Sequence, residues 1–422
     1  MKVKFEPENL KQELDQLLDF CENYEIKYDL DHYYPYWDED GEVIDEEETN
    51  NDITIIDYNT EISIGLPRSY EDYKHKLGLI LNIVNEAKNG KNVDNYKFIG
   101  KKLAFIRVGC NNWEIFNKLF LESDMDFSKN IIISEKSYQL NIVNGLTSFG
   151  IILTMEGKLS KYVPPVDNDD IFLQISSRDG IDHHVIDHLF NSYIFELKST
   201  LGLEAYIAPK PDHNPWEEVA DFADSELTNL KLRPLIYGKG INELLDIYNT
   251  TITTHDPEML ILTYTRVIEY VSQTVIRKDL IEKTVNKLSS PKALTPDANY
   301  ILELGKIFEE HRNNNKDFLA TRITIETCCD LLDLVKHAPK FLKKTNKINI
   351  DNKSEDRQKA FDEIASSVSN TRNMFAHAKT NYQPKGDECP KEQLHDFAEF
   401  VDVIAQQIIR WFSRQPENTR LV

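Results

Sequence analysis

The chain has 422 residues, a length that predicts two or three domains, and 41% of the residues are hydrophobic, enough for ordinary buried cores. No apolar run approaches the ~18 residues of a membrane span, and the charged N-terminus lacks the apolar stretch of a secretory signal. The five cysteines form no CxxC pair, which favours reduced thiols. We therefore expect a cytoplasmic protein without membrane segments.

The net charge of −22 is unevenly distributed along the chain. Residues 241–422 contain 25 Lys and Arg against 27 Asp and Glu, so residues 1–240 contain 24 against 44. The acidic part repels phosphate backbones, which makes the near-neutral part the better candidate for nucleic-acid contact. That part contains a basic run, and a solvated loop is the alternative interpretation of it. The candidate RNA-binding residues in this run are Lys340, Lys343, Lys344 and Lys347.

The first elements along the chain predict a mixed, sheet-rich domain. An amphipathic helix places Leu10, Leu14, Leu17 and Leu18 on one face. Further helical segments are expected near 70–88, 112–122 and 181–202. Short runs rich in β-branched residues predict strands of a mostly antiparallel sheet. These runs are ITIIDY (53–58), EISIGL (61–66), KLAFIRVG (102–109), NIIISEK (130–136), YQLNIV (138–143), FGIILTME (149–156) and IFLQIS (171–176).

A proline-rich stretch, APKPDHNPW, separates this region from a part without strand signals. We therefore predict an α+β protein in which a sheet-rich N-terminal domain precedes an all-α helical bundle. The predicted domains are an acidic sensor or regulatory domain over 1–207, a linker over 208–239, and the helical bundle over 240–422.

Five helices are predicted after the linker. The first begins at Asp256-Pro257-Glu258, which has the residues typical of a helix start. The others cover about 298–311, 316–336, 355–378 and 389–412, and the asparagine-rich stretch His311 to Asp317 predicts a loop. The last helix repeats apolar residues at spacings of three and four from Leu394 to Trp411, the pattern of a bundle seam.

The predicted helix 355–378 contains an Arg, an Asn and a His within six residues. At 100° per residue, its apolar residues fall within about 80° and form a core face. Asn373 and His377 are four residues apart and lie roughly opposite that face, so His377 is expected to point away from its own bundle. The residues of the core face are Phe361, Ile364, Val368, Thr371 and Phe375.

The segment TRNMFAHAK, inside a predicted all-α bundle, resembles the Arg–Asn–x–x–x–His motif of HEPN domains, which are widespread in prokaryotic toxins and anti-phage proteins. DPEMLILTYTRVIEY resembles the early helix of that family with its acidic residue, and the resemblance covers roughly residues 240–422. It implies that Arg372, Asn373 and His377 form the active motif, with Glu269 as a looser match. It also implies a metal-independent endoribonuclease that requires no cofactor.

These residue types suit RNA cleavage by attack of the 2′-hydroxyl. A histidine transfers protons near neutral pH, an arginine binds the non-bridging phosphate oxygens, and an asparagine orients the histidine or donates to the phosphate. The reaction uses an acid and a base, whereas this chain offers one such motif. HEPN ribonucleases are understood to pool two motifs, so we expect a homodimer through the C-terminal helical domain with RNA as substrate and an unknown trigger at the N-terminal domain.

Two alternatives accompany this hypothesis. The helical domain could act as a non-catalytic HEPN dimerisation or nucleotide-binding module in a regulatory protein. Separately, DHHVIDH places His184 and His188 at i and i+4, the spacing of two metal ligands on a helix. No third ligand is identifiable from the sequence, so we predict no metal site there.

Overall fold

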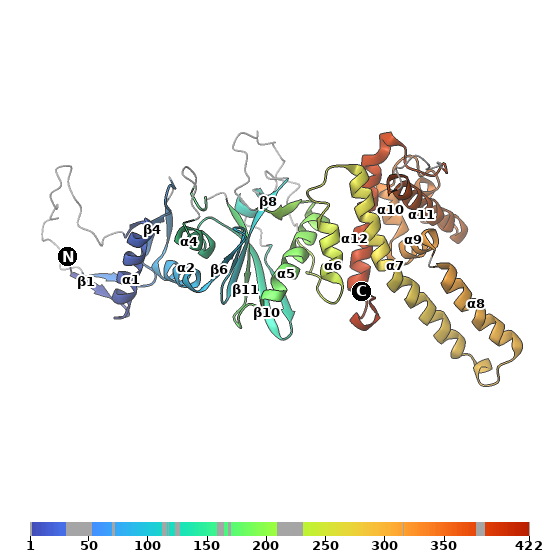
Figure 1. The fold of residues 1–422 in the computed structure, drawn as a ribbon, viewed down its shortest axis with the longest axis horizontal. Helices are drawn as coiled ribbons and strands as arrows, with labels where there is room; N and C mark the ends of the chain where they lie inside the picture. The colour runs from blue at the N-terminus through green and yellow to red at the C-terminus, as the bar shows by residue number, and fades with distance from the viewer. Residues whose placement is uncertain are drawn as a thin grey trace. The chain divides into compact units, whose positions relative to one another are not determined.

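The computed structural model describes residues 2–30, 53–69, 72–111, 116, 118–122, 127–157, 164–167, 170–208, 231–314, 316–376 and 385–421 (Figure 1). The chain forms two compact units. The first comprises residues 1–190 and 203–233, and the second comprises 191–202 and 234–422. A sheet-rich region followed by an all-helical region confirms the predicted α+β fold class.

The first unit is built on a seven-stranded sheet with the order β6-β7-β8-β11-β10-β9, in which β12 also pairs with β8. Every pairing in this sheet is antiparallel, in agreement with the mostly antiparallel sheet predicted from the runs of β-branched residues. Its strands are β6 (Lys91–Val93), β7 (Lys97–Ile99), β8 (Leu103–Cys110), β9 (Lys129–Ile133), β10 (Lys136–Asn144), β11 (Ile171–Ser176) and β12 (Ala205–Ile207).

Smaller sheets and helices complete the first unit. Strands β2, β4 and β5 form an antiparallel sheet, whereas β1 pairs in parallel with β3. Helix α1 buries Leu10, Leu14 and Leu17 on the predicted face. The bounds of these elements are β1 (Lys2–Phe5), α1 (Leu10–Asn23), β2 (Lys27–Asp29), β3 (Ile53–Ile56), β4 (Glu61–Gly65), β5 (Tyr73–Lys76), α2 (Leu77–Asn89), α4 (Ser148–Met155), α5 (His183–Glu196) and the π-helical turns Lys118–Glu122 and Leu197–Leu201.

One strand prediction was wrong. FGIILTME, residues 149–156, forms helix α4, in which every residue from Ser148 to Thr154 is buried. A helix that is buried on all sides has no polar face, so a short apolar run of this kind is equally compatible with a buried strand. Packing between α2 and the sheet decides the outcome, because Phe149 and Ile152 belong to the core of this unit.

The second unit is a bundle in which α7, α9, α11 and α12 surround a single hydrophobic core. Helix α7 begins at Pro257, and the Asp256 carboxylate accepts a hydrogen bond from the Glu258 N–H at 3.0 Å, as the capping residues predicted. The helices are α6 (Ile241–Asn249), α7 (Pro257–Leu288), α8 (Ala298–Asn314), α9 (Asp317–Cys328), α10 (Leu331–His337), α11 (Ser354–Ala376) and α12 (Leu394–Ser413).

Several helices in this unit differ from the predictions. The last helix begins at Leu394 rather than Cys389, after a 3₁₀ turn at Lys391–Gln393, and α6 was not predicted. The predicted helix 316–336 is two helices, α9 and α10, because the Asp330 carboxylate accepts a hydrogen bond from the Leu332 N–H at 2.9 Å and starts a new helix. The predicted loop 311–317 is helical as far as Asn314. Asparagine and histidine are poor helix formers, yet such propensities are weak and neighbouring turns override them.

The boundary between the units also lies elsewhere than the sequence suggested. Residues 191–202 belong to the helical unit, where Phe195 is part of the core and Glu196 forms a bidentate ion pair with Arg410 on α12. Of the predicted linker 208–239, residues 209–230 lie outside the described residues.

Candidate functional site

Helix α11 turns the predicted face toward the core of the bundle. Phe361, Ile364, Val368 and Thr371 are all buried, and Phe375 is partly buried against the same core. This confirms the core face predicted from the spacing. Arg372 lies at the edge of this face and Asn373 lies roughly opposite it, and both residues are half-buried.

The Arg372 guanidinium connects two helices. Its Nη2 lies 3.0 Å from Oε1 of Glu269 on α7, and its Nη1 donates to Oδ1 of Asn373 at 3.0 Å. The side chains of Arg372 and Glu269 are 29% and 46% exposed. The two contacts fix the plane of the guanidinium, for which no further partner is found among the described residues. The structure therefore brings three of the four predicted residues together.

The fourth residue, His377, belongs to segment 377–384, which lies outside the described residues. The chain is anchored next to α11 where the description resumes. The Cys389 N–H donates to the buried Thr371 hydroxyl at 2.9 Å. Because Thr371 directly precedes Arg372, described residues on both sides of this segment lie close to Arg372.

The basic run sits on a different side of α11 from Arg372. Glu363 on α11 accepts hydrogen bonds from the backbone N–H groups of Lys344 and Thr345, at 2.7 to 3.0 Å. Glu363 and Arg372 are nine residues apart, which corresponds to about 180° around the helix and about 13 Å along it. The side chains of Lys340, Lys343, Lys344 and Lys347 are exposed. Within one copy of the chain, these lysines therefore do not line the same face as Arg372.

Arg266 is a site residue that the sequence analysis did not single out. It is exposed on α7, three residues before Glu269, and forms no ion pair among the described residues. Residues at i and i+3 are neighbours on one helix face. Arg266 therefore adds positive charge within one turn of Glu269. Its i, i+3 spacing from Glu269 is the sequence signal by which it could have been found.

Four of the five cysteines are unsuited to act as nucleophiles. Burial raises the pKa of Cys389 to about 12 and that of Cys21 to about 12, and it also raises the pKa of Cys328 and Cys329. These thiols are protonated at neutral pH, and the thiolate is the reactive form.

Metal ligands do not cluster in the part of the chain that the structure describes. No group of three or more His, Cys, Asp or Glu residues there is arranged to hold a metal ion. Near His184 and His188, the Asp187 carboxylate instead pairs with Lys97 at 2.5 Å. Among the described helices, none combines the length and apolar character that crossing a bilayer requires.

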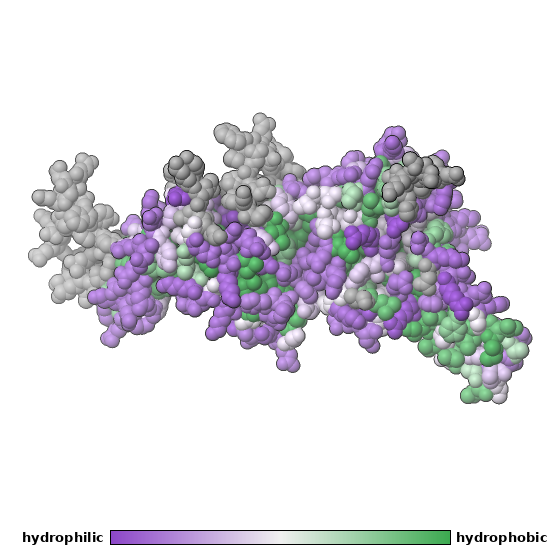
Figure 2. Space-filling model, viewed as in Figure 1, coloured by the Kyte–Doolittle hydropathy of each residue, from purple (hydrophilic) through white to green (hydrophobic). Residues whose placement is uncertain are grey.

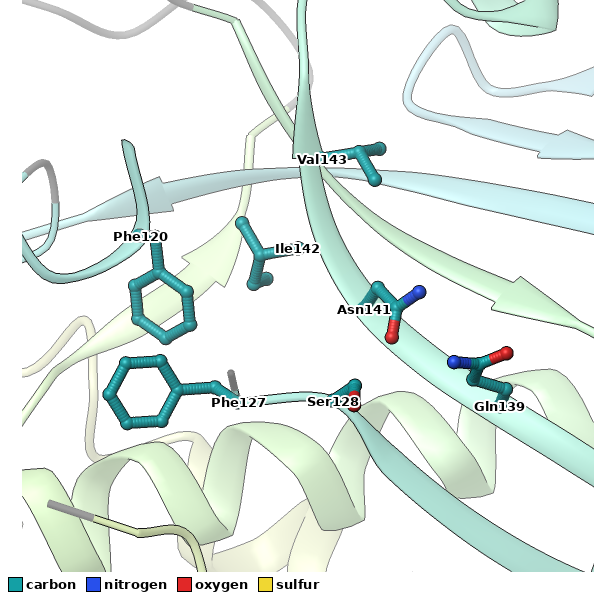
Figure 3. A pocket seen from close by; sticks show the side chains of 7 residues that line it. All are labelled: Phe120, Phe127, Ser128, Gln139, Asn141, Ile142 and Val143. Carbon is teal, nitrogen blue, oxygen red and sulfur yellow. The ribbon is translucent and has the colours of Figure 1, made fainter. Parts of the chain in front are cut away.

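The first unit contains a pocket of about 330 Å³ beside β10 (Figure 3). Phe120 and Phe127 line one side, with ring centroids 4.8 Å apart. Gln139 and Asn141 project from β10 on the other side, and the buried Oδ1 of Asn141 has no hydrogen-bond partner among the described residues. The pocket combines apolar rings with amides, and none of the described residues that line it is charged.

Comparison with known proteins gives no match, whether to a family model, to a curated protein or to a solved structure.

Proposed function

We propose that the protein is a metal-independent endoribonuclease of the HEPN type, acting in a cytoplasmic anti-phage or toxin system. The observation that carries the proposal is the 3.0 Å contact between Arg372 and Glu269. The resemblance implicated both residues from separate helices, and their association forms a charged, half-exposed cluster around Asn373. A purely structural helix face has no requirement for such a cluster at its accessible edge.

The proposed chemistry uses the cluster to bind a phosphodiester. Arg372 contributes its free N–H groups to the non-bridging oxygens, where negative charge grows in the transition state. The 2′-oxygen attacks phosphorus and its proton passes to a base, while the P–O5′ bond breaks and the 5′-oxygen receives a proton from an acid. The products are a 2′,3′-cyclic phosphate and a 5′-hydroxyl. We assign proton transfer to His377, whose ordinary pKa of about 6.5 suits both roles.

One motif supplies one histidine, whereas the reaction needs an acid and a base together. The proposed active site is therefore composite, with a second copy of the chain contributing a second Arg372, Asn373 and His377. In this arrangement Glu269 acts as a positioning residue, because its carboxylate holds the guanidinium from the side that faces α7.

A second candidate function is a non-catalytic HEPN module that dimerises or binds nucleotides. The observation that favours it is the engagement of both terminal nitrogens of Arg372 by oxygens of its own chain, which reduces the charge available to RNA. The net charge of −22 points in the same direction.

Cleavage of RNA by the purified full-length chain in EDTA separates the two functions. We expect wild type to produce cyclic-phosphate ends, and Arg372→Ala and His377→Ala to reduce the rate by at least about 100-fold. Arg233→Ala, which removes an exposed arginine of the first unit, is the matched control and should cleave as wild type does. If His377→Ala cleaves as fast as wild type, the ribonuclease proposal is wrong.

A further inference from the structure

Helix α8 is poorly supported by its own chain. Of its 17 residues, Ala298–Asn314, the structure buries only Tyr300. Its contact with α7 includes two ion pairs, Lys283 with Glu310 at 3.3 Å and Lys287 with Glu303, and a hydrogen bond from the Tyr300 hydroxyl to the Lys287 carbonyl oxygen at 3.1 Å. Helices of globular proteins gain most of their stability from packing an apolar face, so α8 lacks the burial that such a helix requires.

Part of the apolar surface of α8 is exposed, whereas Leu304 and Ile307 are half-buried. Ile301 is 55% exposed and Phe308 is 44% exposed, and on a helical wheel both lie roughly opposite Glu303 and Glu310, which contact α7. Figure 2 shows apolar side chains gathered on the surface of the α7–α8 hairpin. Exposed apolar surface of this extent on a single element is typical of an interaction site.

Gly305 lies between Ile301 and Phe308 on the same stripe. A Cβ atom placed on Gly305 would meet nothing within 4 Å, so the chain itself does not require glycine there. Glycine is a poor helix former in the middle of a helix. A small residue at this position is useful where another backbone approaches α8 closely from outside.

The stripe ends in opposite charges. Asp297, whose side chain is 55% exposed, precedes its first turn, and the exposed Arg312 occupies its last turn. Asp297, Ile301, Gly305, Phe308 and Arg312 fall within about 80° on the wheel and span about 22 Å along the helix. Among the described residues, Arg312 forms no ion pair.

This order of residues is complementary to itself when reversed. If two copies of α8 lie antiparallel about a two-fold axis near Gly305, positions equally distant from that axis face each other. Ile301 then meets Phe308 of the second copy, and Arg312 meets Asp297 of the second copy. A two-fold interface uses the same surface on both partners, and it requires this kind of self-complementary pattern.

We propose that α8 is a homodimerisation surface, on which α8 of a second copy packs in the antiparallel direction with Gly305 at the crossing point. One apolar pair and one ion pair form on each side of the axis, which gives two of each in the dimer by symmetry. Further exposed apolar residues extend the available surface along the hairpin, which brings it to several hundred Å², on the order of half of a standard interface. These are Ile281, Val285, Leu288, Leu294 and Leu302, which are 47% to 88% exposed.

This surface is distinct from the cluster around Arg372, and the inference does not rest on the proposed ribonuclease activity. Failure of RNA cleavage would leave the pairing of α8 untouched. Conversely, a wild type that stays monomeric would exclude this pairing and the composite active site together, whereas a dimer that does not cleave RNA would count against the ribonuclease alone.

Light scattering and sedimentation of the full chain test the apolar part of the interface. At about 10 µM we expect wild type to be dimeric, and Ile301→Glu to weaken association roughly 30-fold or more. Met259→Glu, which changes a 50% exposed apolar residue near the start of α7, is the matched control and should remain dimeric. A monomeric wild type, or an Ile301→Glu variant as dimeric as wild type, would overturn the proposal.

Charge reversal tests the direction of packing. Arg312→Asp and Asp297→Arg each place like charges opposite each other, so each variant alone should associate at least about tenfold more weakly. Mixed together, the two variants restore both opposite-charge pairs, and a heterodimer should form. Asp297 also accepts a hydrogen bond from the Tyr300 N–H at 2.7 Å, so circular dichroism must show that α8 is retained.

Absence of a heterodimer with both variants folded would overturn the antiparallel arrangement. A monomeric wild type that instead co-sediments with lipid vesicles would also overturn it, and would assign the apolar surface to a membrane.

Discussion

The Arg372 guanidinium on α11 lies 3.0 Å from the Glu269 carboxylate on α7, and the same guanidinium donates to Asn373 at 3.0 Å. Arg372 and Glu269 lie at the edge of the bundle, where their side chains are 29% and 46% exposed. Such a pair contributes little to stability because solvent screens it. Its consequence is positional, since it fixes the orientation of the guanidinium.

Glu269→Gln tests this positional role. Glutamine retains an acceptor oxygen but loses the charge that orients Arg372, so we expect kcat for RNA cleavage to fall about tenfold. The KM for RNA should stay the same or decrease, because a negative charge near the phosphate is removed. Steady-state kinetics of the purified variant measure both constants. An unchanged or increased kcat would show that Glu269 only neutralises Arg372.

Lys343→Ala/Lys344→Ala tests the basic run as a second RNA contact. The two lysines are exposed and lie on another side of α11 from Arg372. We expect weaker RNA binding, with the slope of log Kobs against log salt reduced by about 1.4 for single-stranded RNA, and an unchanged kcat. Lys101→Ala/Lys102→Ala removes two adjacent exposed lysines of the first unit and serves as the control. Equal salt slopes for both double variants would contradict a specific role for the basic run.

Arg410→Ala should destabilise the helical unit strongly. Arg410 forms a bidentate ion pair with Glu196 at 3.0 and 3.1 Å, and the Glu196 side chain is fully buried. Loss of the arginine leaves an unpaired buried carboxylate, which costs about 3–5 kcal/mol of the free energy of unfolding. Lys359→Ala, which breaks an exposed ion pair with Asp356, should cost less than about 1 kcal/mol. Denaturant unfolding of both variants measures the difference.

Replacing the Glu196–Arg410 pair by apolar residues gives the complementary test. Glu196→Leu/Arg410→Met should cost less than Arg410→Ala alone, because no buried charge is left without a partner. A double variant that is less stable than the single variant would show that the pair itself, rather than the orphaned charge, determines the loss.

Tyr248 should make the stability of the helical unit depend on alkaline pH. Burial, followed by the nearby Asp402 charge, raises the pKa of Tyr248 well above its ordinary value of about 10. The folded state therefore holds this proton more tightly than the unfolded state, so its contribution is complete below pH 10 and declines as the pH rises above 10. Between pH 9 and 11, the free energy of unfolding should fall more steeply for wild type than for Tyr248→Phe.

A further prediction concerns the stability of the Tyr248→Phe variant at neutral pH. The Tyr248 hydroxyl donates to Asp402 Oδ1 at 2.6 Å, and its loss should cost about 1–3 kcal/mol of the free energy of unfolding. Parallel slopes for the two proteins above pH 9 would contradict a raised pKa at Tyr248.

Features that depend on a few neighbouring residues were predictable from the sequence. The Asp256 cap and Pro257 fix the start of α7, and the spacing from Leu394 fixes the buried seam of α12. The core face of α11 follows from the same periodicity, because one turn of helix sets which side chains share a face. The sheet-rich first part and the helical second part follow from the change of period along the chain.

Features that depend on surroundings were not predictable. FGIILTME forms a helix because α2 and the sheet cover it on all sides, and an apolar run of that length has no period to distinguish the two structures. The break between α9 and α10 depends on one capping aspartate, Asp330, within an otherwise helical stretch. Residues 191–202 join the helical unit through the pairing of Glu196 with a residue on the last helix.

The sequence by itself determined that Arg372 stands at the edge of the core face of one helix and Asn373 roughly opposite that face, because consecutive positions on a helix are fixed by its pitch. Only the tertiary structure decided that Glu269 reaches Arg372, that the lysine run lies on another side of α11, and that the apolar stripe of α8 is left uncovered. Each of these relationships involves segments far apart in the chain, and each is set by how the helices pack rather than by any local pattern.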